Sequence, residues 1–353
     1  MRVRDRMIRF GPAGIPLSCK GRTLQDGIED VHNLSLSALE VQMVRPMTQL
    51  RSPDDDEIGK AFGEIGQDNE EGFAISILRD GEVISYPDEP IDEDDNIIVL
   101  QSDMVKKYGD FVTIGRRAKW LDVNLSIHTP YYMDLGSETA LAETCLESVQ
   151  NTALILDALE GDIVVTSLGI YDDEHRSREE VEEVIYANVE YLTEWWKDRK
   201  IKPRFGVEVT GQQGVFGSLE QIFDLCKEFP SITPVMNFSH YYSRTDGSLK
   251  EVDDFRDILD DISSHCKGRI HTAFAGVEYE DGDEKRLTPI KKGSLKFDPL
   301  AEALIEMKPD ATVISTSPLL EHDAMYMKII YERVLAKKVA KNLKDKKKSE
   351  ASE

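Results

Sequence analysis

The sequence predicts an α/β protein of the (β/α)8 TIM-barrel type with a small β insertion after the second strand. Short apolar runs alternate with amphipathic segments along most of the chain, which implies a parallel sheet covered by helices. Eight such pairs fit into roughly 300 residues, the size of a closed barrel. No Gly-x-Gly-x-x-Gly motif opens the first predicted helix, so the sequence gives no support to a doubly wound dinucleotide-binding sheet.

The first 45 residues form one β-α-β unit. Met7–Gly14 is an apolar run that leads into a Gly/Pro loop, and Thr23–Leu34 has apolar residues at helical spacing. Ala38–Arg45 is a second apolar run that contains one acid, Glu40. We therefore expect two barrel strands joined by a helix.

The alternation stops between residues 50 and 103. Ser52–Glu57 is an acidic loop, and Phe73–Tyr86 alternates apolar and polar residues around Asp80-Gly81. Asp-Gly between alternating segments is a hairpin signal. With a further predicted strand at Asn96–Gln101, this segment predicts a β-rich insertion, and residues 1–49 and 104–336 are left to form the barrel.

The remaining units follow in order from residue 104. Ser177 and Glu180 stand at the two positions of a capping box and mark the start of a long helix. The predicted helices are Met104–Leu121, Ala140–Leu159, Ser177–Lys200, a helix from Leu219, Val252–Ser263, Phe297–Met307 and His322–Ala336. The predicted strands are Val123–Tyr132, Asp162–Tyr171, Phe205–Val209, Ile232–Tyr242, Arg269–Tyr279 and Ala311–Ser317. Residues 337–353 are rich in lysine and are predicted to be a disordered tail.

The composition is acidic, with 43 Lys and Arg against 67 Asp and Glu and a net charge of −24. This balance argues against broad, non-specific nucleic-acid binding, which needs a positive surface. It leaves room for a local basic groove. Two basic clusters, Lys106–Lys119 and Lys337–Lys348, are interpreted as a solvated helix face and a charged tail.

The sequence predicts a cytoplasmic protein that does not enter a membrane. No apolar run approaches the roughly 20 residues that span a bilayer, and the first residues lack the apolar centre of a signal peptide. The four cysteines are scattered and form no Cys-x-x-Cys pair, so reduced thiols are expected and a thiolate metal site is not.

Arg204–Phe223 is the stretch around which the candidate site is built. A short apolar run carrying Glu208 leads into a glycine-rich turn, and Ser218 caps the helix that follows. A carboxylate at the end of a buried strand is costly unless it is paired or binds a metal. In a barrel of alternating strands and helices, the carboxyl ends of the strands carry the chemistry.

Other polar residues stand at the predicted ends of strands: His128, Ser167, Asn237, His240, His271 and Thr316. Histidine and glutamate that converge from different strands suit zinc or manganese. Tyrosines near two of these ends, Tyr131 and Tyr132 and then Tyr241 and Tyr242, suit either stacking on a sugar or base, or ordinary packing. Arg244, Arg286, Lys291 and Lys292 suit either phosphate binding or solvation.

The chain also resembles the endonuclease IV family (AP endonuclease family 2) of xylose isomerase-like TIM barrels, over Met7 to about Leu335 apart from the insertion. Three segments carry most of the resemblance: Ser126–Leu135, SIHTPYYMDL; Gly206–Ser218, GVEVTGQQGVFGS; and Asn237–Arg244, NFSHYYSR. RIHTAF and Ile314–Ala324 resemble the last two strand ends. The closest form is an archaeal-type subgroup with such an insertion.

The resemblance implies a zinc-dependent DNA-repair phosphodiesterase that cleaves abasic-site DNA. Its metal ligands would be His128, Glu208, His240 and His271, with Glu208 catalytic. Tyr131, Gln212, Arg244 and Arg286 would contact the substrate. Ser167, Asn237 and Thr316 stand where the family has histidine, aspartate and glutamate.

These replacements remove carboxylates that three zinc ions would need, so one ion is expected. Zinc is preferred over manganese, held by His128 and Glu208 with His271 and an Asn237 oxygen. Two alternatives stay open. One is a sugar-phosphate isomerase or epimerase of the same barrel family, and the other is a degenerate barrel that binds without catalysing.

Overall fold

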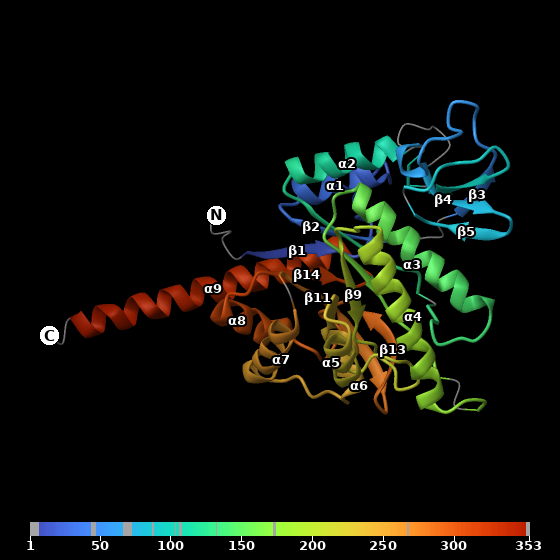
Figure 1. Ribbon diagram of the computed structural model, residues 1–353. Coiled ribbons are helices and arrows are strands. Elements are labelled where there is room, and N and C mark those ends of the chain that lie inside the picture. Colours follow the sequence, from blue (N-terminus) through green and yellow to red (C-terminus); the bar gives the residue numbers. More distant parts are fainter. Residues whose placement is uncertain are drawn as a thin grey trace.

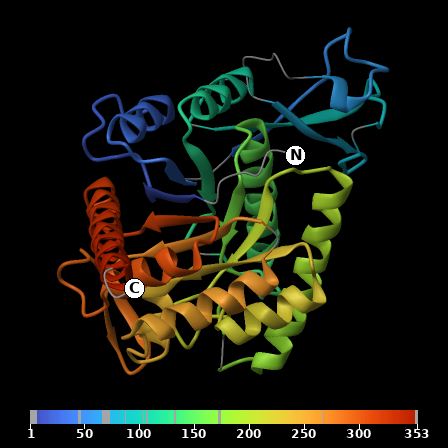
Figure 2. The same ribbon diagram turned by 90° about the vertical axis from the view of Figure 1, so that its left-hand side faces the viewer.

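The computed structural model describes residues 7–43, 47–65, 73–86, 88–102, 104–105, 108–131, 133–171, 174–266 and 268–350. Eight parallel strands form one sheet that curls into a nearly closed barrel, and helices surround it (Figures 1 and 2). The predicted fold class is confirmed.

The eight barrel strands lie in the order β1-β14-β11-β10-β9-β8-β7-β2, and every hydrogen-bonded neighbour is parallel. Their bounds are β1 Ile8–Pro12, β2 Ala38–Gln42, β7 Asn124–His128, β8 Ile163–Thr166, β9 Arg204–Glu208, β10 Ile232–Asn237, β11 Ile270–Phe274 and β14 Ala311–Ser315. The helices are α1 Leu24–Asn33, α2 Tyr108–Trp120, α3 Ala140–Ala158, α4 Arg178–Asp198, α5 Leu219–Glu228, α6 Phe238–Arg244, α7 Val252–His265, α8 Phe297–Met307 and α9 Glu321–Glu350.

The barrel approaches closure between β1 and β2. A single parallel bridge joins Ala13 to Glu40, and the backbone N–H of Ser37 donates to the carbonyl of Phe10 at 3.0 Å. A Cβ on Gly11 would lie 1.7 Å from the carbonyl oxygen of Ala38. Only glycine permits this approach of the two strands.

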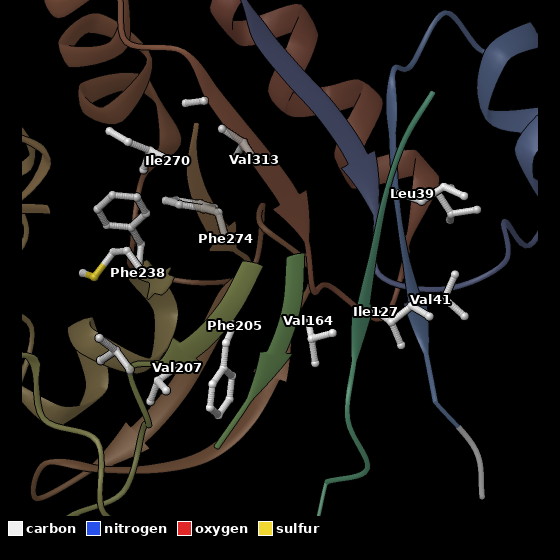
Figure 3. Close-up of a cluster of buried hydrophobic side chains, with 14 of the residues drawn as sticks. Leu39, Val41, Ile127, Val164, Phe205, Val207, Phe238, Ile270, Phe274 and Val313 are labelled. Carbon is white, nitrogen blue, oxygen red and sulfur yellow. The ribbon is translucent and has the colours of Figure 1, made fainter. Parts of the chain in front are cut away.

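Alternation along the strands separates two apolar layers. On β9, Phe205 and Val207 belong to the large core between the sheet and the helices, part of which is shown in Figure 3. Ile163, Val165 and Val235 form a separate small cluster. Because side chains alternate between the faces of a strand, Glu208 lies on the opposite side from Phe205 and Val207, inside the barrel.

The insertion is a four-stranded antiparallel sheet in the order β3-β6-β4-β5, as predicted in type and place. Its strands are β3 Met47–Arg51, β4 Phe73–Arg79, β5 Glu82–Ile84 and β6 Asn96–Gln101, with a 3-10 turn, η1, at Phe62–Glu64. Asp80 and Gly81 both have positive φ, 51° and 86°, as the predicted hairpin turn requires. The sheet has a small core of its own, centred on Ile77, Ile91 and Ile97.

Most predicted strands are shorter in the structure, and two of them, Ile232–Tyr242 and Arg269–Tyr279, contain the start of an element that the sequence analysis missed. The segment Asn237–Arg244 is the N-cap and helix α6, because the Asn237 side chain accepts hydrogen bonds from the N–H groups of Ser239 and His240. After β11 the chain forms a hairpin, β12 Gly276–Glu280 and β13 Asp283–Thr288.

The last helix is longer than predicted. We expected it to end at Ala336 and to be followed by a disordered tail, whereas α9 continues to Glu350. Lysine makes up half of the added residues 337–350, and lysine is a good helix former. The limits proposed for the barrel and insertion domains remain a prediction. In the described part of the chain, no helix is both long and apolar enough to cross a membrane.

Candidate functional site

A cavity of about 400 Å³ opens at the carboxyl ends of the barrel strands. The residues that line it come from strand ends, from the loop after β9 and from the β12–β13 hairpin. They are Ala13, Glu40, Gln42, His128, Tyr131, Ser167, Glu208, Thr210, Gly211, Gln212, Val215, Asn237, His240, Glu284, Leu287 and Thr316. This is the face on which barrel enzymes place their chemistry.

Glu208 is the centre of the cavity's charged cluster. Its Oε2 lies 3.3 Å from His128 Nε2 and 3.6 Å from His240 Nε2. Its Oε1 accepts a hydrogen bond from Asn237 Nδ2 at 3.2 Å. The structure thus brings together four of the predicted site residues.

The second nitrogen of each imidazole has a hydrogen-bond acceptor. His128 Nδ1 lies 2.7 Å from the carbonyl oxygen of Thr129, and His240 Nδ1 lies 2.6 Å from Glu284 Oε2. An acceptor at Nδ1 requires a proton there, so both rings have fixed orientations. Each ring therefore presents Nε2 to Glu208.

The three groups shift one another's pKa. Burial alone raises the pKa of Glu208, but hydrogen bonds from His128 and His240 outweigh burial and hold this pKa well below its ordinary value. Burial alone lowers the pKa of His128, but the Glu208 carboxylate raises it to about 9. With Glu208 and Glu284 both beside it, the pKa of His240 rises to about 10 despite burial. At neutral pH the cluster holds a carboxylate between two imidazolium rings.

His271 is not part of this cluster. Its side chain is 1% exposed, and its Nε2 lies 2.9 Å from Glu40 Oε2, which also accepts from Ser126 Oγ. His271 Nδ1 is buried without a hydrogen-bond partner among the described residues. Glu40 lines the cavity, so it connects the buried histidine to the site.

The predicted substrate contacts have different positions. Tyr131 stands at the rim, 77% exposed, and Gln212 also lines the cavity. Arg244 donates to Thr210 Oγ1 and to the carbonyls of Gln212 and Val215, so it supports the loop after β9. Arg286 pairs with Glu278 on the exposed hairpin. Neither arginine lines the cavity, and Tyr132 lies outside the described residues.

The resemblance implies a bound divalent ion, and the donor atoms of the cluster decide whether these residues fit one. The described residues contain no group of three or more His, Cys, Asp or Glu that could hold a metal ion. The oxygen of Asn237 is taken by two backbone N–H groups, and its amide nitrogen faces Glu208. The donor set as arranged does not fit a resident zinc or manganese ion, and no chemical step below is routed through one.

Glu284 and Leu287 are lining residues that the sequence analysis missed. Both lie on the β12–β13 hairpin, most of which follows the strand that was predicted to end at Tyr279. Asp281 and Gly282, with φ values of 53° and 80°, form its turn. An Asp-Gly pair here is the same signal that identified the hairpin of the insertion.

The family model described as the xylose isomerase-like TIM barrel matches residues 95–322, more than half of the chain. The chain belongs to this family. An uncharacterized protein of Methanocaldococcus jannaschii is 27% identical over 336 residues, which cover 94% of this chain and 99% of that protein.

Solved structures similar to this xylose isomerase-like barrel include endonuclease IV and sugar epimerases. Endonuclease IV from Thermus thermophilus has a TM-score of 0.57 at 14% identity, and the match covers 93% of this chain and 99% of that one. The 3-keto-D-glucoside 4-epimerase from E. coli has a TM-score of 0.56 at 11% identity, with 93% and 100% covered. D-psicose 3-epimerase from Clostridium cellulolyticum H10, solved with D-tagatose, has a TM-score of 0.52 at 11% identity, with 88% and 93% covered. At these identities the likeness concerns the fold.

Proposed function

We propose that this barrel binds a small, uncharged sugar in the Glu208 cavity and moves a proton on it, as an isomerase or epimerase does. The observation that carries the proposal is the chemistry of the lining. It offers hydroxyl, amide, carboxylate and imidazole groups, and no lysine or arginine among the described residues. Such groups suit the hydroxyls of a sugar, whereas a phosphate is usually held by arginine or lysine.

The size of the cavity supports the same class of substrate. A volume of about 400 Å³ lies in the range of small-molecule sites. A DNA duplex needs a far larger contact surface, rich in basic side chains, on the order of 1,000 Å². Arg244 and Arg286, for which phosphate binding and solvation were both open, are engaged in other contacts.

Each member of the cluster has a role in such a reaction. His128 and His240 are placed to donate Nε2 protons to a substrate carbonyl oxygen, where negative charge develops when the neighbouring carbon loses its proton. Glu208 is placed to accept that proton and to return it, because its pKa rises once both imidazolium rings donate to the substrate oxygen instead of to Glu208. Glu284 fixes His240 in its donating orientation. The proton leaves and returns, so the atoms balance without another reactant.

Two of the structural neighbours support this choice by their names, since they are sugar epimerases. The described lining residues include no lysine or arginine that could bind the phosphate group of the sugar-phosphate alternative. The proposal is therefore limited to unphosphorylated sugars.

The test is hydrogen exchange on a sugar. D-fructose and D-tagatose are incubated with the protein in D₂O, and deuterium at the carbon next to the carbonyl is followed by NMR. The wild type should incorporate deuterium and Glu208→Gln should not. Glu302→Gln, an exposed position on α8, is the matched control and should behave as the wild type. The proposal would be refuted if neither sugar binds and neither exchanges hydrogen. If a sugar binds without exchange, the proposed sugar binding would stand and the proposed proton transfer would be refuted.

A phosphodiesterase of the endonuclease IV type is the second candidate. The observation that favours it is the meeting of His128, Glu208 and His240 at positions where the resemblance places metal ligands. It needs a metal that the present donor set does not fit. Cleavage of a duplex with one abasic site, tested with added zinc or manganese and lost in Glu208→Gln, would favour this candidate over the sugar proposal.

A further inference from the structure

A groove separates the insertion sheet from helix α3. Two cavities of about 390 and 320 Å³ lie along it and share Thr48, Glu147 and Asn151. Apolar side chains form much of its walls, including Leu50 of β3 and Leu141 of α3, which are 51% and 43% exposed. We call it the α3–β3 groove.

The lining of the α3–β3 groove contains acidic side chains without ion pairs and an amide side chain without a hydrogen bond. Glu143 and Glu147 lie one turn apart on α3, both exposed, and neither has an ion pair with any described residue. The described residues that line the two cavities include no lysine or arginine. Asn151 is 5% exposed and lines both cavities, and its side chain has no hydrogen bond within the described chain. A basic partner with hydrogen-bonding groups would satisfy all three side chains.

The distal part of α9 has the opposite character. Every described side chain from Val339 to residue 345 is exposed. Leu335, Val339 and Leu343 are 39%, 49% and 56% exposed and recur every four residues, so they lie along one face. Lys337, Lys341 and Lys344 lie around the rest of the helix, with no ion pair among the described residues. We call residues 335–350 the α9 arm.

The apolar face of the α9 arm is left exposed by its own chain. Among the described residues, the last ion pair between the arm and the body is Lys338 to Glu306, at 2.8 Å. The arm cannot use the groove of its own chain, because α9 projects from one side of the molecule and the insertion lies on the other (Figures 1 and 2).

We propose that the α9 arm of one copy of this chain lies in the α3–β3 groove of a second copy. Glu143 and Glu147 are four residues apart, as are Lys337 and Lys341, so two ion pairs form together when the helices lie side by side. Lys337 and Lys341 lie on the side of the arm opposite Leu335, Val339 and Leu343, so the apolar face then turns toward Leu50 of β3 across the groove. Reciprocal exchange of arms gives a closed dimer with two-fold symmetry.

The test is the mass of the full-length protein in solution, by sedimentation velocity at low and high salt. The wild type should be a dimer that weakens with salt, and removal of residues 337–353 should give a monomer. Glu143→Lys with Glu147→Lys should weaken the dimer about tenfold or more, because rim charges then repel. Adding Lys337→Glu and Lys341→Glu to the same chain should restore it.

Val339→Glu with Leu343→Glu is an independent variant, because both side chains are exposed and their change leaves the core intact. It should also give a monomer with an unchanged circular dichroism spectrum of the body. A monomeric wild type at all concentrations, or a dimer that survives removal of the arm, would overturn the proposal. The outcome does not depend on the function proposed for the Glu208 cavity.

Discussion

Asn237 joins helix α6 to Glu208: its Oδ1 accepts from the N–H groups of Ser239 and His240, while its Nδ2 donates to Glu208 Oε1 at 3.2 Å. One side chain therefore caps the helix that carries His240 and also holds the carboxylate that faces this histidine. The amide does both because it has an acceptor and a donor. A carboxylate at this position could cap the helix, but it would repel Glu208.

Replacing Asn237 by Asp should exchange this hydrogen bond for a second negative charge. Without metal, the variant should be less stable by about 1–3 kcal/mol, because Glu208 loses a donor and gains a like charge. With zinc present it should regain stability, because the added carboxylate supplies a missing ligand. Thermal unfolding with and without zinc, and elemental analysis of tag-free protein, measure both effects. Equal zinc content in wild type and variant would contradict the account of the donor set.

Glu208→Gln should lower the pKa of both histidines that face it. Burial disfavours the imidazolium, and His128 then loses the carboxylate that raised its pKa to about 9. The pKa of His240 should fall less from about 10, because Glu284 remains beside it. Titration of the ring protons by NMR gives both values.

The same substitution changes how stability depends on pH. A histidine with a raised pKa contributes stability that is fully present below its unfolded value of about 6.5 and is lost as pH rises through its folded value. The wild type should therefore lose stability between about pH 7 and pH 10 more steeply than Glu208→Gln. Parallel curves for the two proteins in urea unfolding would show that the histidines are not charged by Glu208.

Asp162→Asn should destabilise the amino end of the barrel. Asp162 Oδ2 lies 2.9 Å from Arg204 Nη2, and both side chains are mostly buried. Burial raises the pKa of Asp162, but Arg204 outweighs it and lowers the pKa. Removing one partner of such a pair costs about 3 kcal/mol at neutral pH.

The pH dependence provides the check on Asp162. Because the folded pKa of Asp162 is lowered, its contribution is present above the unfolded value of about 3.9 and is lost as pH falls through the folded value. The stability difference between wild type and Asp162→Asn should shrink below about pH 4. A difference that is constant from pH 7 to pH 3 would exclude the ion pair as its cause.

Arg199→Ala should loosen the insertion without unfolding the barrel. Its guanidinium donates to the carbonyls of Ser85 at 2.6 Å and Ile75 at 2.9 Å, and it lies over the ring of Phe62. We expect faster proteolysis within residues 47–101 and little change in the unfolding of the barrel. Arg199→Lys is the matched control, since it keeps the charge but not the two-pronged contact, and it should give an intermediate rate. Unchanged proteolysis in Arg199→Ala would show that the apolar contacts alone hold the insertion.

The barrel could be predicted because its signals are local and repeated. The alternation of apolar strands and amphipathic helices is visible from neighbouring residues alone, without knowledge of distant contacts. Asp80-Gly81 likewise predicts a hairpin turn from two adjacent residues. The strand end at Asn237 was missed because a side-chain cap, and not an apolar pattern, begins α6. The helical conformation of the α9 arm was missed, because its polar composition is typical of a disordered segment as well as of a solvent-exposed helix.

The candidate site was predictable in part. Because side chains alternate along a strand, Glu208 and His128 point into the barrel and line the cavity. Both could be predicted because they stand at the carboxyl ends of strands. The partner of His271 could not, because Glu40 lies 231 residues away and only barrel closure brings it near. Glu284 could not be predicted, because it lies in an acidic segment that has the composition of a loop. Its contact with His240 depends on how the hairpin folds over the site.

The measurement that tests the central claim most directly is equilibrium binding to the Glu208 cavity by calorimetry. D-tagatose, D-tagatose 6-phosphate and an abasic-site duplex are compared on wild type and Glu208→Gln. The account predicts that the free sugar binds the wild type, that the phosphate weakens binding because no cation meets it, and that Glu208→Gln binds neither sugar well. Tight, Glu208-dependent binding of the duplex, with no binding of either sugar, would contradict it.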